Sequence, residues 1–290
     1  MPVMELSDPA EDIDSFLKSL YYFHPCADSD LEDEHDPDAL PTFPDAWAGI
    51  LRLASKYDAP GPRAFSVRAL RMAWPRSLGD WDCLQTLRKA RPRAACCEPA
   101  KLILLAQEYG VPTALPALYY ELLLSTELAV PAGDPRRADI AQLGPTQLCA
   151  LVFARGAVLS FVLERIKERP WHDAIAALCM RPGEGTYSPC NIVLEAWWGE
   201  NMRVALEGDR PADGNYFAWL NGKVESWDVM DEGEVCVGCH AWLRDWLVGT
   251  RESLWRALPE LFGLQHILPK GWDGSVQAPA EPAIDIDGVD

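Results

Sequence analysis

The sequence predicts a mainly α-helical protein, and three observations carry that prediction. Apolar residues recur at intervals of three and four along most of the 290-residue chain, which is the period of an amphipathic helix. Proline, glycine and capping residues bound these segments, as they do at helix ends. Strand-like sequence is scarce, and residues 2–6 are the one short segment that favours a strand.

The first predicted helix begins after Asp8 and Pro9. Aspartate is a common N-cap, proline fits the first helical position, and Glu11 completes a spacing similar to a capping box. Its apolar face repeats at i, i+3, i+4 and i+7: Ile13, Phe16, Leu17 and Leu20. The acidic residues that follow, within 28–38, predict a flexible loop.

The clearest segment is a predicted helix hairpin between Trp47 and Leu70. Apolar residues keep a helical period on both sides of residues 58–62, whose sequence DAPGP interrupts the pattern. Two helices joined by a turn this short fold back on each other. We expect the following side chains to pack in this region or to contact a partner: Phe16, Leu20, Trp47, Leu51, Tyr57, Phe65 and Leu70.

Further helices are predicted with short connectors, which favours antiparallel neighbours in a bundle. Residues 130–135, VPAGDP, are the best internal boundary. Beyond it we expect, in order, a long helix at 148–166, helices near 172–180 and 191–206, a loop at 207–237 and a helix at 238–257. The Pro-, Ala- and Asp-rich residues 276–290 predict a disordered tail.

Charge and composition limit the kinds of partner and the compartment that we expect for this protein. The formal net charge is -18, and such a charge repels phosphate backbones and anionic lipid headgroups, so we expect neither a nucleic-acid nor a membrane partner. No run approaches the roughly 18 consecutive apolar residues of a membrane helix. The cysteine count is nine, an odd number, and no Asn-x-Ser/Thr site occurs, which indicates a reducing compartment, the cytoplasm or the nucleus.

The compact Cys-x-x-Cys pair, Cys236 and Cys239, is the nearest approach to a metal-binding motif. A structural zinc site needs about four ligands. Cys179 and Cys190 offer a second pair, but nothing in the sequence joins the two pairs. We therefore predict no metal and no cofactor, with Cys236 and Cys239 as the candidates if a structural zinc exists. A redox dithiol is the other alternative, although the βαβ context of such motifs is absent from the sequence pattern.

Catalytic motifs are also missing from the sequence. It contains no P-loop, no His-Glu-x-x-His and no Gly-x-Ser-x-Gly. His240 adjoins Cys239, but adjacent residues on a helix diverge by roughly 100° and seldom face each other. We therefore expect a protein that is not an enzyme and has no catalytic residues, while a zinc-stabilised helical domain and an unrecognised enzyme stay open as alternatives.

Two segments carry a resemblance to a known family. Residues 4–12, MELSDPAED, resemble the strand-to-helix passage within a BTB/POZ domain, and residues 49–63, GILRLASKYDAPGPR, resemble the helix pair that ends it. A late segment, residues 254–264, is similar to one found in BTB/POZ-domain proteins of mushroom-forming (basidiomycete) fungi. Met1 falls where the middle of a complete BTB/POZ domain is expected, so the resemblance implies a domain without its strand-rich N-terminal half.

The resemblance implies a division of the chain and a class of function. It implies the C-terminal helical part of a BTB/POZ fold followed by a helical, BACK-like bundle. The expected division is a partial BTB/POZ domain at 1–75, a helical extension at 76–129 and a C-terminal helical domain at 136–267. The implied function is a non-catalytic adaptor or scaffold that binds proteins. A cullin-type ligase is a partner that the family alone suggests.

Overall fold

Helices form all the regular structure in the described part of the chain. The computed structural model describes residues 7–22, 45–90, 98–125, 140–168, 171, 179–180, 188–203, 214–230 and 234–272, and no strand occurs among them. The predicted mainly α class is confirmed. Five expected features lie wholly or mostly outside the described residues: the strand at 2–6, the acidic loop at 28–38, the boundary at 130–135, the helix near 172–180 and the tail at 276–290.

The chain divides into two compact units. Unit 1 comprises Met1–Tyr119 with His266–Asp290, and unit 2 comprises Tyr120–Gln265. The finer division expected from the sequence stays a prediction. The elements that begin in unit 1 are α1 (Ala10–Tyr22), α3 (Asp45–Lys56), α4 (Pro60–Ala73), α5 (Leu78–Ala90), α6 (Pro99–Glu108), the 3₁₀ helix η2 (Pro112–Ala114) and α7 (Leu115–Ser125), which continues into unit 2.

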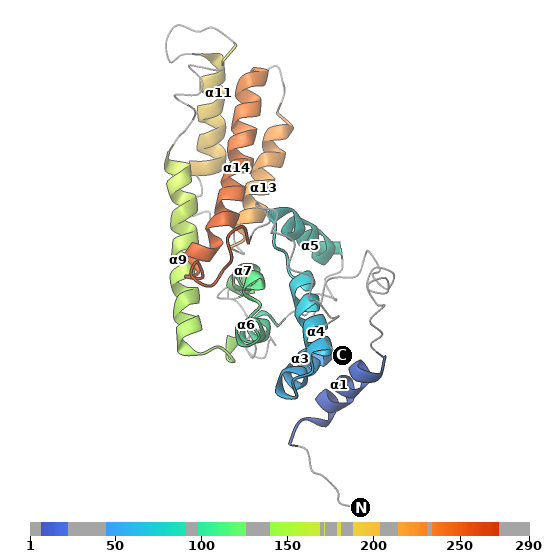
Figure 1. The fold of residues 1–290 in the computed structure, drawn as a ribbon. Helices are drawn as coiled ribbons and strands as arrows, with labels where there is room; N and C mark the ends of the chain where they lie inside the picture. Colours follow the sequence, from blue (N-terminus) through green and yellow to red (C-terminus); the bar gives the residue numbers. More distant parts are fainter. Residues whose placement is uncertain are drawn as a thin grey trace, which may run out of the picture. The chain divides into compact units, whose positions relative to one another are not determined.

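The helix hairpin expected between Trp47 and Leu70 is present as α3 and α4 (Figure 1). The connection is shorter than residues 58–62, because Pro60 is already the first residue of α4, where a missing N–H removes no helical hydrogen bond. Asp58 makes the turn with a φ of 51°. Leu51 and Leu70 are fully buried in unit 1.

Helix α1 packs on α3 through a close backbone approach at Gly49. A Cβ atom at Gly49 would lie 2.8 Å from Cγ and 3.2 Å from Cα of Asp12. Phe16 joins a small core with Ile50, Leu53 and Ala54. The face of α1 that is buried therefore differs from the predicted one: Asp12, Phe16 and Ser19 are buried, whereas Leu17 and Leu20 are exposed.

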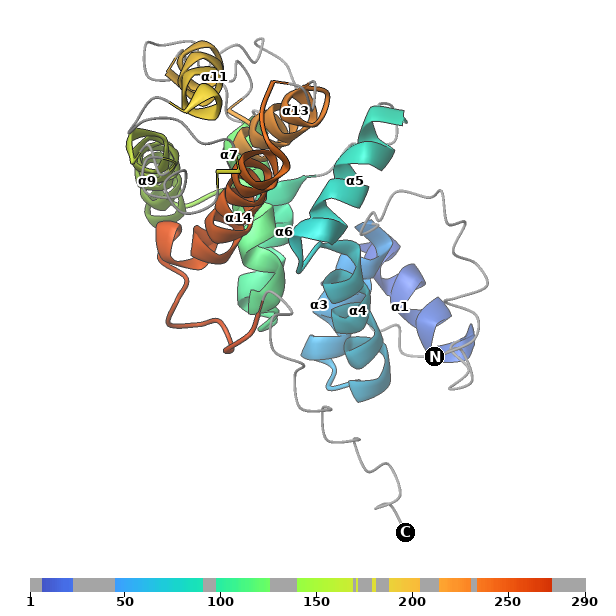
Figure 2. The same ribbon diagram turned by 90° about the horizontal axis from the view of Figure 1, so that it is seen from above.

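Four helices make the body of unit 2. They are α9 (Pro145–Lys167), α11 (Pro189–Trp198), which continues into the π-helical segment η3 (Gly199–Arg203), α13 (Tyr216–Asp228) and α14 (Val237–Leu261). Figures 1 and 2 show them side by side, and α14 packs against both α9 and α13. Aromatic rings fill the space between them: Trp198 lies 4.5 Å from Trp171 and 5.1 Å from Trp246, measured between ring centroids.

The loop expected at 207–237 is wrong for residues 216–228, which form α13. Glycine and acidic residues suggested a loop, but the apolar residues within the segment keep a helical period. Asn215 caps the helix by accepting a hydrogen bond from the Ala218 N–H at 3.0 Å. The buried face of α13 consists of Tyr216, Phe217, Leu220, Val224 and Trp227.

Within the described residues, α9 has the length and composition of a membrane-spanning helix. In its apolar stretch 22% of the residues are buried, and Val152 and Phe153 are exposed. Arg155 and Glu164 interrupt its apolar sequence, and one stripe of α9 is buried within unit 2. The stripe consists of Leu151, Ala154, Val158, Val162 and Ile166.

We expect Gly49→Ala to destabilise the packing of α1 on α3. The new methyl group would press on Asp12, and overpacking of this kind costs about 1–3 kcal/mol. The matched control is Gly61→Ala in α4, where no atom lies within 4 Å of the added Cβ. This control should leave stability unchanged or raise it by up to about 1 kcal/mol. Urea unfolding and hydrogen exchange of α1 measure the stability of both variants. Equal stability of the two variants would contradict the close approach of α1 to Gly49.

Candidate functional site

Cys236 and Cys239 mark the beginning of α14. Cys236 is the N-cap residue and Cys239 is the third residue of the helix. The spacing places both side chains at the same end of α14, close to its free N–H groups. Both residues are buried.

Cys190 also lies at a helix start, as the second residue of α11. Ser188 fixes this helix start, because its Oγ accepts a hydrogen bond from the Asn191 N–H at 3.2 Å. Cys190 is fully buried. Cys179 lies next to the same cap, with its Sγ 3.7 Å from the Ser188 Oγ.

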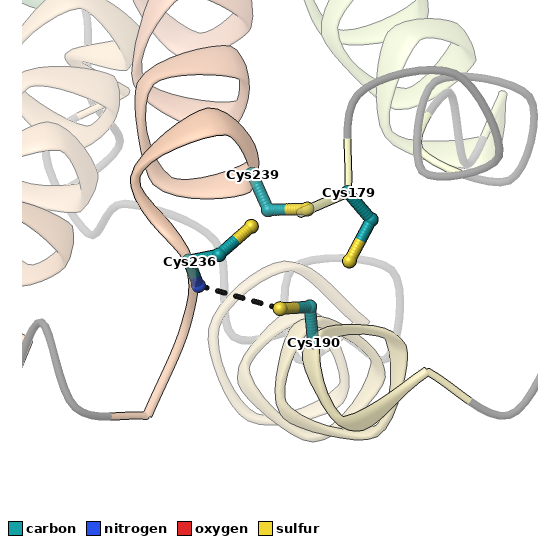
Figure 3. Close-up of side chains that lie close together, drawn as sticks. All are labelled: Cys179, Cys190, Cys236 and Cys239. Carbon is teal, nitrogen blue, oxygen red and sulfur yellow. Dashed lines mark hydrogen bonds between the residues drawn. The ribbon is translucent and has the colours of Figure 1, made fainter. Parts of the chain in front are cut away.

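The four thiols converge on one point of unit 2 (Figure 3). Their Sγ atoms all lie within 4.8 Å of one another. The Cys236 N–H donates a hydrogen bond of 3.3 Å to the Cys190 Sγ, and this bond joins the start of α14 to the start of α11. Residues 46 positions apart in the sequence thus share one cluster, which we name the cysteine cluster: Cys179, Cys190, Cys236 and Cys239.

The thiols of the cysteine cluster differ in pKa. Burial opposes ionisation of Cys236, but the N–H groups of Cys239 and Met180 and the neighbouring thiols outweigh it and lower the pKa of Cys236 to about 6. Burial and the contact with Cys236 raise the pKa of Cys239. Burial also raises the pKa of Cys190. Cys236 is therefore the thiol of the cluster that ionises most readily.

His240 does not join the cysteine cluster. Its ring stacks on Trp227 at a centroid distance of 5.2 Å, and its Nε2 lies 3.2 Å from the Trp227 carbonyl oxygen. The Trp227 indole N–H in turn donates to the His240 carbonyl at 2.9 Å. The expectation that Cys239 and His240 point apart agrees with this geometry.

Four converging sulfurs can hold a soft metal ion, form disulfides or stay as thiols. Cys236 and Cys239 were the candidates that the sequence offered. Cys179 and Cys190 were visible only as an unconnected pair, because the connection depends on how α11 packs against α14. No signal in the sequence relates those two helix starts.

The side chains expected to pack or to contact a partner fall into two groups. Phe16, Leu51 and Leu70 are buried, and the half-buried Trp47 and Phe65 rings lie 5.1 Å apart. The other two are exposed in large part: Leu20 by 46% and Tyr57 by 47%.

The face of α1 that includes Phe16 packs on α3. Beside this packed face lie Leu17, Leu20 and Tyr21, which are exposed by 45%, 46% and 81%. Their spacing of three and four residues makes them neighbours on the helix surface. We name these three residues the α1 apolar row.

Two ion pairs join α1 and the residues just before it to α3. Asp12 Oδ2 accepts from Arg52 Nη2 at 2.8 Å. Asp8 accepts from Lys56 Nζ at 2.6 and 2.7 Å and from the Tyr57 hydroxyl at 2.8 Å. These contacts lower the pKa of Asp8, and the hydrogen bond from Lys56 has a larger effect than the one from Tyr57. Asp8 therefore does not cap α1 as the sequence predicted.

Comparison with protein-family models, with curated proteins and with solved structures finds no match to this chain.

Asp8→Asn tests the outer ion pair. The amide cannot pair with Lys56, so we expect a lower melting temperature at pH 7. Because folding lowers the pKa of Asp8, its contribution is present above the usual value of 3.8 and is lost as the pH falls through the folded pKa. The difference between wild type and variant should therefore close in acid.

Asp14→Asn is the matched control. Asp14 pairs at 2.7 Å with Lys18 of its own helix, and both side chains are exposed. Such pairs contribute little, so the melting temperature should barely change. Calorimetry across the pH range measures the melting temperatures of wild type and both variants. Equal melting temperatures of the two variants at pH 7 would contradict a role of Asp8 in holding α1 on α3.

Proposed function

We propose that this chain is a non-catalytic protein-interaction module that binds its partner through the α1 apolar row. The observation that supports the proposal most is the exposure of the α1 apolar row beside the face of α1 that packs on α3. Three adjacent large apolar side chains in water favour association with another apolar surface.

The energetics of the row suit a protein partner. Full burial of a leucine contributes about 1.5–3 kcal/mol relative to full exposure, so each half-exposed leucine retains about half of that for a partner. Tyr21 adds an aromatic ring with a hydroxyl, the kind of side chain that is enriched among interface hot spots.

Charge adds a preference for the partner. With a net charge of -18, the chain attracts basic surfaces and repels acidic ones. Asp14 on α1 is exposed, lies three residues before Leu17, and would lie at the rim of an interface. A partner with an apolar groove and a basic border fits this combination.

The BTB/POZ resemblance supports the same proposal. Residues 4–12, which lead into α1, resemble the strand-to-helix passage within that domain, and α3 and α4 correspond to the helix pair that ends it; the row lies on α1. Roles in transcriptional or ubiquitin-ligase scaffolding, with a cullin among the partners, follow from the resemblance alone and are part of the proposal. So is a location in the cytoplasm or the nucleus, which suits the free thiols of the described residues.

Photo-crosslinking at Tyr21 tests the proposal. A benzophenone amino acid at this position should capture a defined protein in cells at stoichiometric yield. The control is the same amino acid at Phe153 of α9, an aromatic residue of similar exposure, 77% against 81%. We expect no common product from the two positions. The same products at both, or none at Tyr21, would contradict the proposal.

The affinity for the captured protein then measures how much the α1 apolar row contributes to binding. We expect Leu20→Glu to weaken binding by at least about 10-fold, equivalent to about 1.4 kcal/mol, because it places a charge in the row. Val152→Glu on α9 is the control, since Val152 is 71% exposed. Isothermal titration should show unchanged affinity for this variant, and an equal loss for both would assign the effect to charge rather than to the row.

A further inference from the structure

We propose that the cysteine cluster binds one Zn²⁺ through four thiolate ligands, in a structural site that ties the start of α11 to the start of α14. This inference concerns unit 2 and is independent of the interaction proposed for α1.

The spacing of the sulfurs fits a tetrahedral ion. Zinc–sulfur bonds of about 2.3 Å place the corners of a regular tetrahedron about 3.8 Å apart. The four Sγ atoms lie within 4.8 Å of one another, and they face a common centre in Figure 3. The largest separation of the sulfurs thus exceeds the edge of such a tetrahedron by no more than about 1 Å.

The surroundings of the sulfurs compensate the charge of such a site. Zn²⁺ with four thiolates carries a net charge of −2. Cys236 and Cys239 lie at the N-terminus of α14, and Cys190 lies at the N-terminus of α11, where helix dipoles favour negative charge. An N–H group also points at sulfur, because the Cys236 N–H donates a hydrogen bond of 3.3 Å to the Cys190 Sγ. Hydrogen bonds of this kind stabilise metal-bound thiolates.

Four protein ligands leave no coordination position for substrate or water, so the site is structural rather than catalytic. Three of the four residues, Cys190, Cys236 and Cys239, are buried. On binding, each protonated thiol forms a Zn–S bond and releases its proton to solvent, and no electron is transferred. Cys179 is thereby fixed to the two helix starts.

A redox dithiol fits the geometry less well. A reactive Cys-x-x-Cys needs one sulfur open to an incoming disulfide. Cys236 is only 7% exposed, and its sulfur lies among the three other thiols of the cluster. Closed disulfides would use the same sulfurs and are distinguished from zinc by thiol counting.

The first experiment uses the full chain purified without chelator. Elemental analysis should give about one zinc per chain. Thiol counting in denaturant, with and without reductant, should show that none of the cluster cysteines is oxidised. Less than about 0.2 zinc per chain, stoichiometric iron instead of zinc, or cluster disulfides would each overturn the proposal.

The second experiment tests the ligands. After removal of zinc under reducing conditions, Co²⁺ should produce the visible and near-ultraviolet bands of tetrahedral thiolate coordination, and one equivalent of Zn²⁺ should abolish them. Cys190→Ser and Cys239→Ser should lose these bands. The controls Cys83→Ser and Cys149→Ser, at exposed cysteines outside the cluster, should keep them.

A third measurement remains decisive even if the cluster variants fail to fold. Hydrogen exchange of wild-type protein with and without a strong chelator should show faster exchange at the first turns of α11 and α14 on chelation. Peptides from α3 and α4 in unit 1 should not change. Unchanged exchange at both helix starts after zinc has been removed would overturn the structural role.

Discussion

The burial of α14 along its length is the constraint on which unit 2 depends. Its buried residues recur every three or four positions from Cys239 to Leu258, and they face both α9 and α13. Even a charged residue of this stripe, Arg251, is buried, and its Nε donates to the Phe217 carbonyl at 3.2 Å. A helix held this firmly fixes the direction of its own N-terminus, and therefore the position at which Cys236 and Cys239 meet α11.

Unit 1 depends on a different kind of contact. Gly49 lets α1 approach the backbone of α3, and Asp12 fills the space and pairs with Arg52. A buried carboxylate with a charged partner sets the rotation of α1, because leaving the charge unpaired would be costly. The result is that leucines expected in the core, Leu17 and Leu20, lie at the surface.

Periodicity predicted most of the helices but not their rotation or their meeting points. The hairpin of α3 and α4 was predictable because Trp47 and Leu51 repeat in phase and Pro60 marks a helix start. The helix α13 was not predicted because residues 207–237 are rich in glycine and acidic residues, as loops are, although the apolar residues of α13 keep a helical period. The rotation of α1 depends on the pairing of Asp12 with Arg52, which are 40 residues apart. The joining of Cys190 to Cys236 likewise depends on tertiary packing, and spacing alone does not encode it.

The proposed zinc centre would join segments that the sequence leaves unrelated and would stabilise unit 2. X-ray absorption at the zinc edge of the purified protein tests it most directly. We expect four sulfur neighbours at about 2.3 Å from the zinc and no nitrogen or oxygen ligand. A first shell with nitrogen or oxygen in place of sulfur, or protein that contains no zinc to measure, would contradict it.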